Sequence, residues 1–305
     1  MRNTFADEVT NLAKIDNRIM LLSGDIGNKL FDKFKAVDPS RFLNCGIAEA
    51  NMIGVAAGLA LNGLRPIVYT ITPFTTTRCF EQIRVDICYH EAPVIIVGTG
   101  SGLSYAELGP THHSLEDLAI LRTLPGMQVI APCDSIELRH ALYQAVQSNK
   151  PTYIRIGKKG EPNIHNPNAS FTIGKAIPIK DGNRVLILSA GTLMTNALSA
   201  ADKLNAAGVS CAVASFHTIK PLDEEFLKAS ISKFELIATV EEHGKIGGLG
   251  GAIAEFISQY GVHPKLIRIG VEDEFMHEMG TQEYARKKYS LDPDGISEKI
   301  KANLV

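Results

Sequence analysis

The acid best suited to chemistry in this sequence is Glu49. It stands near the start of segment 48–62, whose other side chains are almost all small or apolar. Burying a carboxylate costs free energy unless the group is paired or protonated, so an acid in this context indicates a role such as proton transfer. The alternative is an ordinary acid at the start of a helix, where the helix dipole favours negative charge.

The same segment carries Gly54 and Gly58, which leave one side of a predicted helix nearly without side chains. A glycine inside a helix costs about 1 kcal/mol relative to alanine, so the pair indicates that another backbone approaches closely. That backbone belongs either to the protein's own sheet or to another subunit. In the second case Glu49 would face a cleft that two subunits share.

Short apolar segments that alternate with helical ones must position these residues. Fully apolar strands between helices indicate parallel sheets with both faces covered, so we predict an α/β fold with two domains on parallel or mixed sheets. The predicted strands are 19–22, 66–71, 93–97, 128–131, 152–156, 184–190, 210–215, 235–240 and 265–269. The predicted helices are 48–62, 74–90, 114–123, 134–148, 193–206, 223–231 and 247–259.

A change of composition separates two series of elements. Residues rich in Gly, Pro and Asn follow the strand 152–156 and are typical of an irregular connector. We therefore predict a first domain over 1–165, a linker over 166–183 and a second domain over 184–305. The length of 305 residues also suits two domains.

Composition argues against several classes of function. The formal charge is −2 with basic and acidic residues interspersed, so there is no basic stripe for nucleic acid. The apolar segments are too short to span a membrane, and the first residues carry no apolar signal core. The five cysteines never form a CxxC pair, which gives no zinc signature and no predicted metal site, and favours reduced thiols in the cytoplasm.

Five motifs occur in order over nearly the whole chain. They are Cys-Gly-Ile-Ala-Glu-Ala-Asn-Met-Ile-Gly-Val-Ala-Ala-Gly-Leu-Ala (45–60), Arg-Cys-Phe-Glu-Gln-Ile-Arg (78–84), Gly-Pro-Thr-His-His-Ser-Leu-Glu-Asp-Leu-Ala (109–119), Thr-Ile-Lys-Pro-Leu-Asp (218–223) and Val-Glu-Glu-His-Gly-Lys-Ile-Gly-Gly-Leu-Gly (240–250). The ordered set resembles the C-terminal half of transketolase, above all the split transketolases made of two polypeptides. The resemblance implies a pyrimidine-binding domain, a transketolase C-terminal domain and thiamine diphosphate as cofactor.

The resemblance assigns three residues to the cofactor. Glu49 matches the glutamate that hydrogen-bonds N1′ of the aminopyrimidine and favours the imino tautomer, whose nitrogen removes the C2 proton. Such proton transfer needs a carboxyl group in a dry pocket, where desolvation favours the protonated form. Phe74 matches an aromatic residue that stacks on the pyrimidine, and Asp25 an aspartate at a strand end near the cofactor. The alternatives are core packing for Phe74 and a turn for Asp25.

Four residues are implied for the substrate. His112, in Gly-Pro-Thr-His, matches a histidine that contacts substrate oxygens and can exchange a proton near neutral pH, which makes it the second catalytic residue. His113 has a polar counterpart in the family, and a solvated loop histidine is the alternative. Arg155 matches an arginine that holds the substrate phosphate through paired hydrogen bonds. Arg2 matches a second phosphate-binding arginine.

Two positions depart from the family pattern. Leu108 stands where transketolases carry an aspartate that binds a sugar hydroxyl, and Gly100 stands where they carry a phosphate-binding histidine. A leucine cannot accept a hydrogen bond, so a hydroxyl buried against it would lose its partner. The ordinary pentose-phosphate specificity is therefore in doubt, which leaves the donor and the acceptor open.

The sequence lacks the Gly-Asp-Gly motif, with a downstream Asn, that holds Mg²⁺ and diphosphate in this family. We therefore expect another polypeptide, an N-terminal transketolase-type subunit, to supply that site in an α₂β₂ assembly. The chain alone should be inactive. The expected reaction of the complex is transfer of a two-carbon ketol unit between a ketose and an aldose, with a phosphorylated sugar as substrate.

Two other functions stay open on the sequence. The beta subunit of the first component of a 2-oxo-acid dehydrogenase is favoured by Leu108 and by the His-His-Ser sequence that follows it. Against this alternative, Gly-Pro-Thr-His and Arg155 favour phosphorylated sugars. The third function is a non-catalytic partner that only stabilises or regulates another subunit, although the presence of Glu49, Phe74 and His112 together argues against it.

Overall fold

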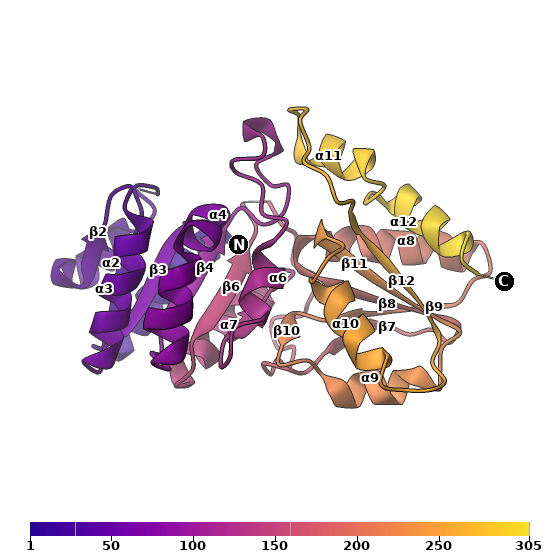
Figure 1. Ribbon diagram of the computed structural model, residues 1–305, viewed down its shortest axis with the longest axis horizontal. Coiled ribbons are helices and arrows are strands. Elements are labelled where there is room, and N and C mark those ends of the chain that lie inside the picture. The colour runs from indigo at the N-terminus through magenta and orange to yellow at the C-terminus, as the bar shows by residue number, and fades with distance from the viewer. Residues whose placement is uncertain (28, 159, 305) are drawn as a thin grey trace.

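The computed structural model describes residues 1–27, 29–158 and 160–304, which form two β-sheets with their helices (Figure 1). The first sheet has the strand order β10-β5-β6-β4-β3-β1-β2. Its strands are β1 (Ile19–Ser23), β2 (Phe42–Asn44), β3 (Arg65–Ile71), β4 (Ile95–Thr99), β5 (Gln128–Ile130), β6 (Thr152–Ile156) and β10 (Thr218–Lys220). The neighbours pair in parallel, apart from β10, which runs antiparallel to β5. The predicted α/β class is confirmed.

Helices cover both faces of this sheet because successive side chains of a strand point to opposite faces. On β1, Leu21 packs in the core beneath α1, α2 and α7, whereas Leu22 packs in the core beneath α3 and α6. Both leucines are fully buried. These helices are α1 (Arg2–Ile15), α2 (Asp32–Val37), α3 (Glu49–Leu61), α6 (Asp117–Arg122) and α7 (Ser135–Gln147), with short 3₁₀ helices η1 (Pro39–Arg41) and η4 (Ala106–Leu108).

The predicted helix 74–90 is interrupted in the structure. Its pieces are α4 (Thr72–Thr75), η2 (Thr77–Cys79), α5 (Phe80–Gln82) and the π-helical η3 (Ile83–Tyr89). Two threonine hydroxyls explain the first break, since Thr76 Oγ1 donates to the Thr72 carbonyl at 2.7 Å and Thr77 Oγ1 donates to the Pro73 carbonyl at 2.8 Å. Such bonds to the preceding turn destabilise and bend a helix.

The second sheet has the strand order β12-β11-β8-β9-β7. Its strands are β7 (Ile177–Lys180), β8 (Val185–Ala190), β9 (Cys211–Ser215), β11 (Leu236–Gly244) and β12 (Lys265–Val271). Its helices are η5 (Gly191–Leu193), α8 (Met194–Ala206), α9 (Glu224–Ile231), α10 (Leu249–Ile257), α11 (Gln282–Lys288) and α12 (Pro293–Lys301). The predicted linker 166–183 differs from the structure because β7 lies within it and pairs antiparallel with β9. An edge strand tolerates Pro178, whose presence hides the strand in the sequence.

The two sheets are joined by more than the connecting segment. The strand β10 comes from the second half of the chain, yet its Thr218 pairs with Ile130 at the edge of the first sheet. One apolar core continues from α3 and α6 to β8, β9 and α10. In Figure 1 the loop before α6 lies beside α11, in agreement with the hydrogen bond of 3.2 Å from Gln282 Nε2 to Ser104 Oγ. The domains therefore share an extensive junction.

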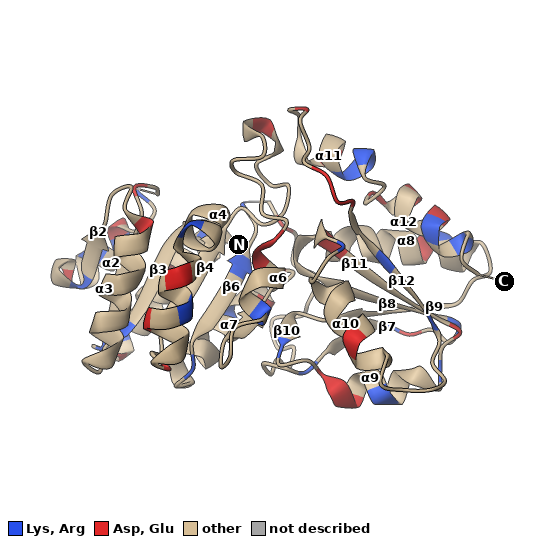
Figure 2. Cartoon of the chain, in the orientation of Figure 1, with Lys and Arg blue, Asp and Glu red and all other residues tan. Residues whose placement is uncertain are grey.

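Charged residues are distributed over the whole molecule. Figure 2 shows Lys and Arg mixed with Asp and Glu on the helices of both domains. Some form surface ion pairs, such as Lys33 with Asp7 at 2.8 Å. Among the described residues, none of the helices has the length and apolar character needed to cross a membrane.

Candidate active site

The carboxyl ends of the parallel strands in the first sheet meet at one edge, which is where α/β folds bind ligands. Asp25 follows β1, Phe74 follows β3, and Glu49 opens α3 shortly after β2. Because β1 lies between β2 and β3, the three residues predicted to bind the cofactor come from neighbouring strands. The topology of the sheet thus gathers residues that are far apart in the sequence.

Glu49 is buried, with 4% of its surface exposed, as predicted. Its Oε2 accepts a hydrogen bond from Arg78 Nη1 at 2.7 Å, whereas its Oε1 accepts no hydrogen bond from any of the described residues. Gly24 passes close to this second oxygen: a Cβ at Gly24 would lie 3.8 Å from Oε1 and 2.8 Å from Thr70 Oγ1. The hydroxyl of Thr70 is also buried, with no hydrogen-bond partner among residues 1–27, 29–158 and 160–304. Two unpaired oxygens therefore lie beside the backbone of Gly24.

Arg78 connects Glu49 to a group of aromatic rings. Its guanidinium carbon lies 4.3 Å from the centroid of the Phe74 ring, a cation–π contact. The Phe74 ring meets the His112 ring edge-to-face, with their centroids 5.1 Å apart. The Tyr105 ring lies 6.0 Å from the same imidazole. The fold thus links the two residues predicted to be catalytic, Glu49 and His112, through Arg78 and Phe74.

The surroundings of His112 keep its imidazole neutral. Partial burial lowers the pKa of His112, and the charge of Arg78 lowers the pKa further. A neutral imidazole has one N–H donor and one lone pair. The hydroxyl of Thr111 lies 2.9 Å from Nδ1, and Nε2 has no hydrogen-bond partner among the described residues. Such a ring can bind an oxygen atom of a substrate and exchange a proton with it.

His113 does not match its interpretation as a solvated loop residue. The side chain is buried, and Nε2 has no hydrogen-bond partner in the described part of the chain. Burial lowers the pKa of His113, and neighbouring His112 lowers the pKa further. The solvated-loop alternative is therefore wrong, whereas a contact with substrate stays a prediction.

Asp25 and Arg2 lie outside the group around Arg78. Asp25 is exposed, and Asn44 Nδ2 lies 3.4 Å from its Oδ1. Arg2, at the start of α1, is half-buried, and its Nε has no hydrogen-bond partner. Within the described residues, neither forms a hydrogen bond or an ion pair with Glu49. Their assigned roles stay predictions.

Arg155 lies inside the domain junction, with 4% of its surface exposed. Its Nη2 donates to the carbonyls of Ser114 and Glu242, both at 2.7 Å. Its Nε lies 3.2 Å from Asp117 Oδ2, which also accepts a hydrogen bond of 2.6 Å from the Tyr153 hydroxyl. The guanidinium thus connects the first sheet, the loop before α6 and the second sheet. The phosphate contact assigned to Arg155 stays a prediction, and this burial argues against it.

Comparison with known proteins decides the family. Residues 1–161 match the transketolase pyrimidine binding domain, and residues 174–296 match the transketolase C-terminal domain. The chain belongs to the transketolase family. The predicted resemblance to the C-terminal half of transketolase is therefore confirmed, together with the two domain types in this order. The family depends on thiamine diphosphate, and the first domain is of the type named for binding the pyrimidine.

Similar proteins show how much of a transketolase this chain represents. It is 38% identical to 6-deoxy-6-sulfo-D-fructose transketolase subunit SqwH of Clostridium sp. (strain MSTE9), over 95% of this chain and 90% of that protein. It is 35% identical to an apulose-4-phosphate transketolase subunit of Phocaeicola vulgatus, over 97% and 94% of the two chains. A solved chain described as split gene transketolase, inactive beta4 tetramer, is 34% identical with a TM-score of 0.89, over 99% and 96% of the two chains. The chain is therefore a subunit of a split transketolase-type enzyme.

Sequence reasoning does not assign Arg78 or Tyr105 to this transketolase site. Arg78 is visible in the sequence only as the first residue of the motif 78–84. Its spacing of four residues from Phe74 is a usable signal, because residues four apart on a helical backbone share one face. Tyr105 follows a glycine-rich segment and carries no comparable signal. Arg78 was missed because its ion-pair partner, Glu49, lies 29 residues earlier in the chain.

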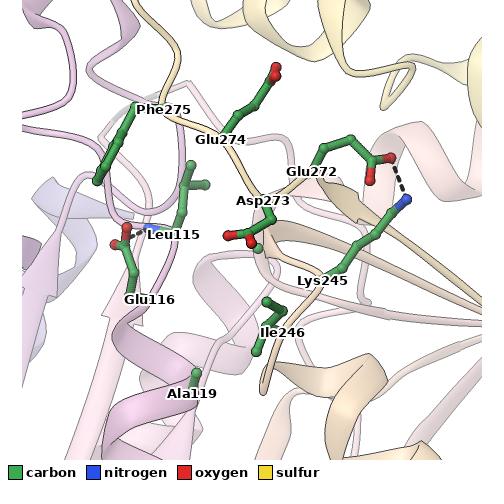
Figure 3. Close-up of a pocket in the computed structure, with 10 residues that line it drawn as sticks. Leu115, Glu116, Ala119, Lys245, Ile246, Glu272, Asp273, Glu274 and Phe275 are labelled. Carbon is green, nitrogen blue, oxygen red and sulfur yellow. Dashed lines mark hydrogen bonds and ion pairs between the residues drawn. The ribbon is translucent and has the colours of Figure 1, made fainter.

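A cavity of about 370 Å³ opens at the junction of the two transketolase domains. Figure 3 shows that its lining residues come from α6 and the two residues before it and from the ends of β11 and β12 with the loops that follow them, with the Lys245–Glu272 ion pair at one side. None of the predicted site residues lines it. This cavity is therefore separate from the site at the edge of the first sheet.

Proposed function

We propose that this chain is the pyrimidine-binding subunit of a thiamine-diphosphate-dependent transketolase, and that the complete enzyme transfers a two-carbon ketol unit from a ketose to an aldose. The observation that carries the proposal is the buried carboxylate of Glu49. One of its oxygens is paired with Arg78 and the other is unengaged, at the carboxyl edge of a parallel sheet. A carboxylate that is buried and only half paired is suited to hold a proton at a bound ring.

The residues at this edge fit an aminopyrimidine ring. Bound thiamine diphosphate supplies a thiazolium carbon that attacks a ketose carbonyl. Glu49 Oε1 is the candidate for the hydrogen bond to a ring nitrogen, and Phe74 is the candidate for stacking on the ring. Gly24 has no room for a Cβ against Thr70, so its backbone can approach the carboxylate closely. We assign Asp25, the next residue, to the polar rim of the same site.

We assign His112 to the oxygens of the sugar. The lowered pKa of His112 keeps the ring neutral, so the ring can donate a hydrogen bond to a carbonyl oxygen or accept a proton from a hydroxyl. Its contact with the Phe74 ring puts it beside the candidate stacking residue. His113 follows with an unpartnered Nε2 and is the second candidate for a substrate contact.

We propose that the donor is a ketose with a terminal anionic group. The names of two relatives contain such a group, a sulfo group in one and a phosphate in the other. Leu108 and Gly100, which depart from the family pattern, support a donor other than the ordinary pentose phosphates. Arg2 is a better candidate than Arg155 for the anion, since Nε of Arg2 has no partner whereas Arg155 is committed to the junction.

We assign the other wall of the site to a partner. Helix α3 exposes Val55 and Gly58, and a Cβ at Gly58 would meet nothing within 4 Å. This part of the glycine face does not pack on the protein's own sheet, which favours the interpretation that another subunit covers it. The name of the similar beta4 tetramer, which calls it inactive, supports an inactive isolated chain. We propose an N-terminal transketolase-type partner that holds Mg²⁺ and the diphosphate in an α₂β₂ assembly.

Three further assignments are proposals of the same kind. The subunit works in carbohydrate metabolism in the cytoplasm, which is consistent with its five free thiols.

The first domain covers 1–165, with a linker from 166 and a second domain over 184–305. The strand β7 belongs with the second domain, since it pairs with β9.

The proposal is tested by mixing the chain with an N-terminal transketolase subunit, thiamine diphosphate and Mg²⁺. A ketose phosphate labelled with ¹³C at both carbons of its ketol unit should pass the two labels together to an aldose, as followed by NMR. Each subunit alone should show no transfer. Labelled CO₂ from carboxyl-labelled pyruvate, without ketol transfer, would establish the 2-oxo-acid dehydrogenase alternative instead.

A further inference from the structure

A second cluster of reactive side chains lies where β5 ends and α7 begins. Cys133 follows β5, Glu137 lies in the first turn of α7, and His165 belongs to the segment that leads to the second domain. One donor atom of each residue lies within 4.8 Å of the donor atoms of the other two. The three side chains are at least nine-tenths buried. A thiolate, a carboxylate and an imidazole are the ligand types that Zn²⁺ takes in proteins.

Two atoms of this cluster have no partner although they are buried. Glu137 Oε1 and His165 Nε2 form no hydrogen bond with any residue that the structure describes, and they lie 3.5 Å apart. A buried polar atom without a partner costs about 1–3 kcal/mol. Two ligand atoms on one tetrahedral Zn²⁺, with bonds of about 2.0–2.2 Å, are separated by roughly 3.3–3.6 Å. The observed spacing therefore matches one edge of a zinc coordination shell.

Asp134 orients the imidazole from its other side. Its Oδ2 lies 3.1 Å from His165 Nδ1 and accepts the backbone N–H groups of Ile164 and His165, both at 2.8 Å. Its Oδ1 accepts the N–H groups of Ile136 and Glu137 at the start of α7. A carboxylate that fixes one ring nitrogen while the other faces a metal is the usual second partner of a metal-binding histidine. The ring is thus held with Nε2 towards Glu137.

Contacts within the cluster also hold Glu137 and Cys133, the other two candidate ligands. Glu137 Oε2 accepts the backbone N–H of Cys133 at 2.7 Å, which leaves Oε1 unengaged. The Cys133 sulfur lies 3.8 Å from His165 Nδ1. Burial raises the pKa of the Cys133 thiol, and the nearby carboxylates of Glu137 and Asp134 raise the pKa further. Without a cation, Cys133 is therefore a protonated thiol.

A candidate fourth donor belongs to the second domain. His217 is fully buried, its Nδ1 lies 2.8 Å from Thr218 Oγ1, and its Nε2 has no hydrogen-bond partner among the described residues. Burial lowers the pKa of His217. His217 lies outside the group of three residues whose donors are mutually close. A water molecule is the alternative fourth ligand.

We propose that Cys133, Glu137 and His165 form a structural site for one transition-metal dication of the zinc type, completed by His217 or water. On binding, the metal–sulfur bond forms as the S–H bond breaks, and the proton leaves to solvent. The site would join the segment after β5, the connecting segment and the loop before β10, and so stabilise the junction of the domains. It lies apart from the sheet-edge group and needs neither the cofactor nor the partner subunit.

The competing arrangement has no metal. In it a protonated His165 would bridge the two carboxylates of Asp134 and Glu137, because the hydrogen bond with Asp134 and the charges of both acids raise the pKa of His165 in spite of its burial. That imidazolium would donate from both nitrogens, and Cys133 would be a bystander. The two arrangements therefore differ in the role of the Cys133 thiol, which binds the ion in the metal site and takes no part in the imidazolium bridge.

The experiment uses the full chain after treatment with a chelator and dialysis. Added Zn²⁺ should bind at one ion per chain by elemental analysis and should raise the unfolding temperature. Added Co²⁺ should give the visible bands of a tetrahedral site and a thiolate-to-cobalt charge-transfer band. If the unmutated chain binds no ion, or binds Co²⁺ without the thiolate band, the proposal is wrong whatever the variants do.

The variants locate the site. Cys133→Ser and His165→Gln should each weaken Zn²⁺ binding at least tenfold and remove the thiolate band or change its position. The matched controls are Cys45→Ser, which changes a half-buried thiol elsewhere, and His90→Gln, which changes an exposed imidazole. Both should keep binding at the level of the unmutated chain. Unchanged binding in Cys133→Ser would show that the ion binds elsewhere and would overturn the assignment.

Discussion

Two buried glutamates, one in each domain, have opposite surroundings. Glu242, on β11, has both oxygens engaged: Oε1 accepts from the Leu103 N–H and from Gln282 Nε2, each at 2.7 Å, and Oε2 accepts from Arg286. Glu49 is buried to nearly the same degree, yet only one of its oxygens has a partner. Burial by itself therefore does not separate Glu49, the proposed catalytic acid, from Glu242. The two acids differ in that one oxygen of Glu49 has no hydrogen-bond partner among the described residues.

Glu242 fixes the loop that carries His112. The acid belongs to the second domain, whereas Leu103 and Gly102 lie in the loop before α6. A Cβ at Gly102 would lie 2.5 Å from the Glu242 carbonyl oxygen, so the loop backbone packs directly against β11. Gly102 also forms a bridge with Ser114, just beyond the histidines. The structural acid thus holds in place the segment that the sheet-edge site uses.

The largest effect should come from Glu49→Gln in the assembled enzyme. The amide keeps the shape of the side chain but cannot hold the proton, so turnover should fall by roughly 10²- to 10⁴-fold. Steady-state ketol transfer measures the loss, and sedimentation velocity should show an unchanged assembly. Glu81→Gln is the control, since it removes an exposed acid that pairs with Arg84, and it should leave turnover unchanged. Turnover of the Glu49 variant within twofold of the unmutated enzyme would support a non-catalytic subunit.

The main effect of Glu242→Ala should be a lower stability of the folded chain. The change leaves Arg286 and the Leu103 N–H without their acceptor in the interior, which should lower the free energy of unfolding by about 3–5 kcal/mol in urea titrations. The control is Glu255→Ala, because that acid pairs with Arg122 but is 66% exposed, and its loss should cost about 1 kcal/mol or less. Equal costs for the two variants would contradict the contrast between a buried and a surface acid.

A smaller effect is expected for Phe74→Ala. Loss of one aromatic stacking partner should weaken the binding of thiamine diphosphate by about 1 kcal/mol, which is roughly fivefold in Kd. The dependence of activity on cofactor concentration in the assembled enzyme measures this change. Tyr89→Ala removes a ring that is 79% exposed and should leave the dependence unaltered. If the Phe74 variant binds the cofactor normally but unfolds more easily, the core-packing interpretation of Phe74 holds.

The smallest effect concerns the titration of His112. Burial and the charge of Arg78 hold the pKa of His112 below its ordinary value of 6.5, so protonation of this ring opposes folding as the pH falls below that value. In Arg78→Gln the pKa should rise, and the acidic limb of the rate profile should move to higher pH. Histidine NMR titrations, with His112→Asn for assignment, measure the pKa. An unchanged or lower pKa would show that Arg78 does not act on the ring.

Most strands could be predicted from local composition. The predicted segments 66–71 and 152–156 coincide with β3 and β6 to within one residue, because every residue in these strands is buried and mostly apolar. Helix α1 was missed because no side chain caps its start. The three-residue strand β10 could not be found, since a partner strand almost ninety residues earlier completes it.

Part of the candidate site could also be predicted from the local sequence. Glu49 and Phe74 stand in segments whose residue types indicate a role, and the fold brings them together through Arg78. Arg155 shows the limit of such reasoning. Its motif indicates an anion, yet the side chain is buried among carbonyls and an acid of the junction. The sequence does not reveal which groups surround it.

By itself, the sequence determined the α/β class, the family resemblance and the choice of Glu49 as the central acid. These depend on the types and the order of nearby residues. Only the tertiary structure decided which polar groups have partners: it left one oxygen of Glu49 unengaged, filled both of Glu242, and brought Cys133 to His165. The physical reason is that hydrogen bonds and ligand sets form over distances of about 3 Å between segments that the chain separates widely.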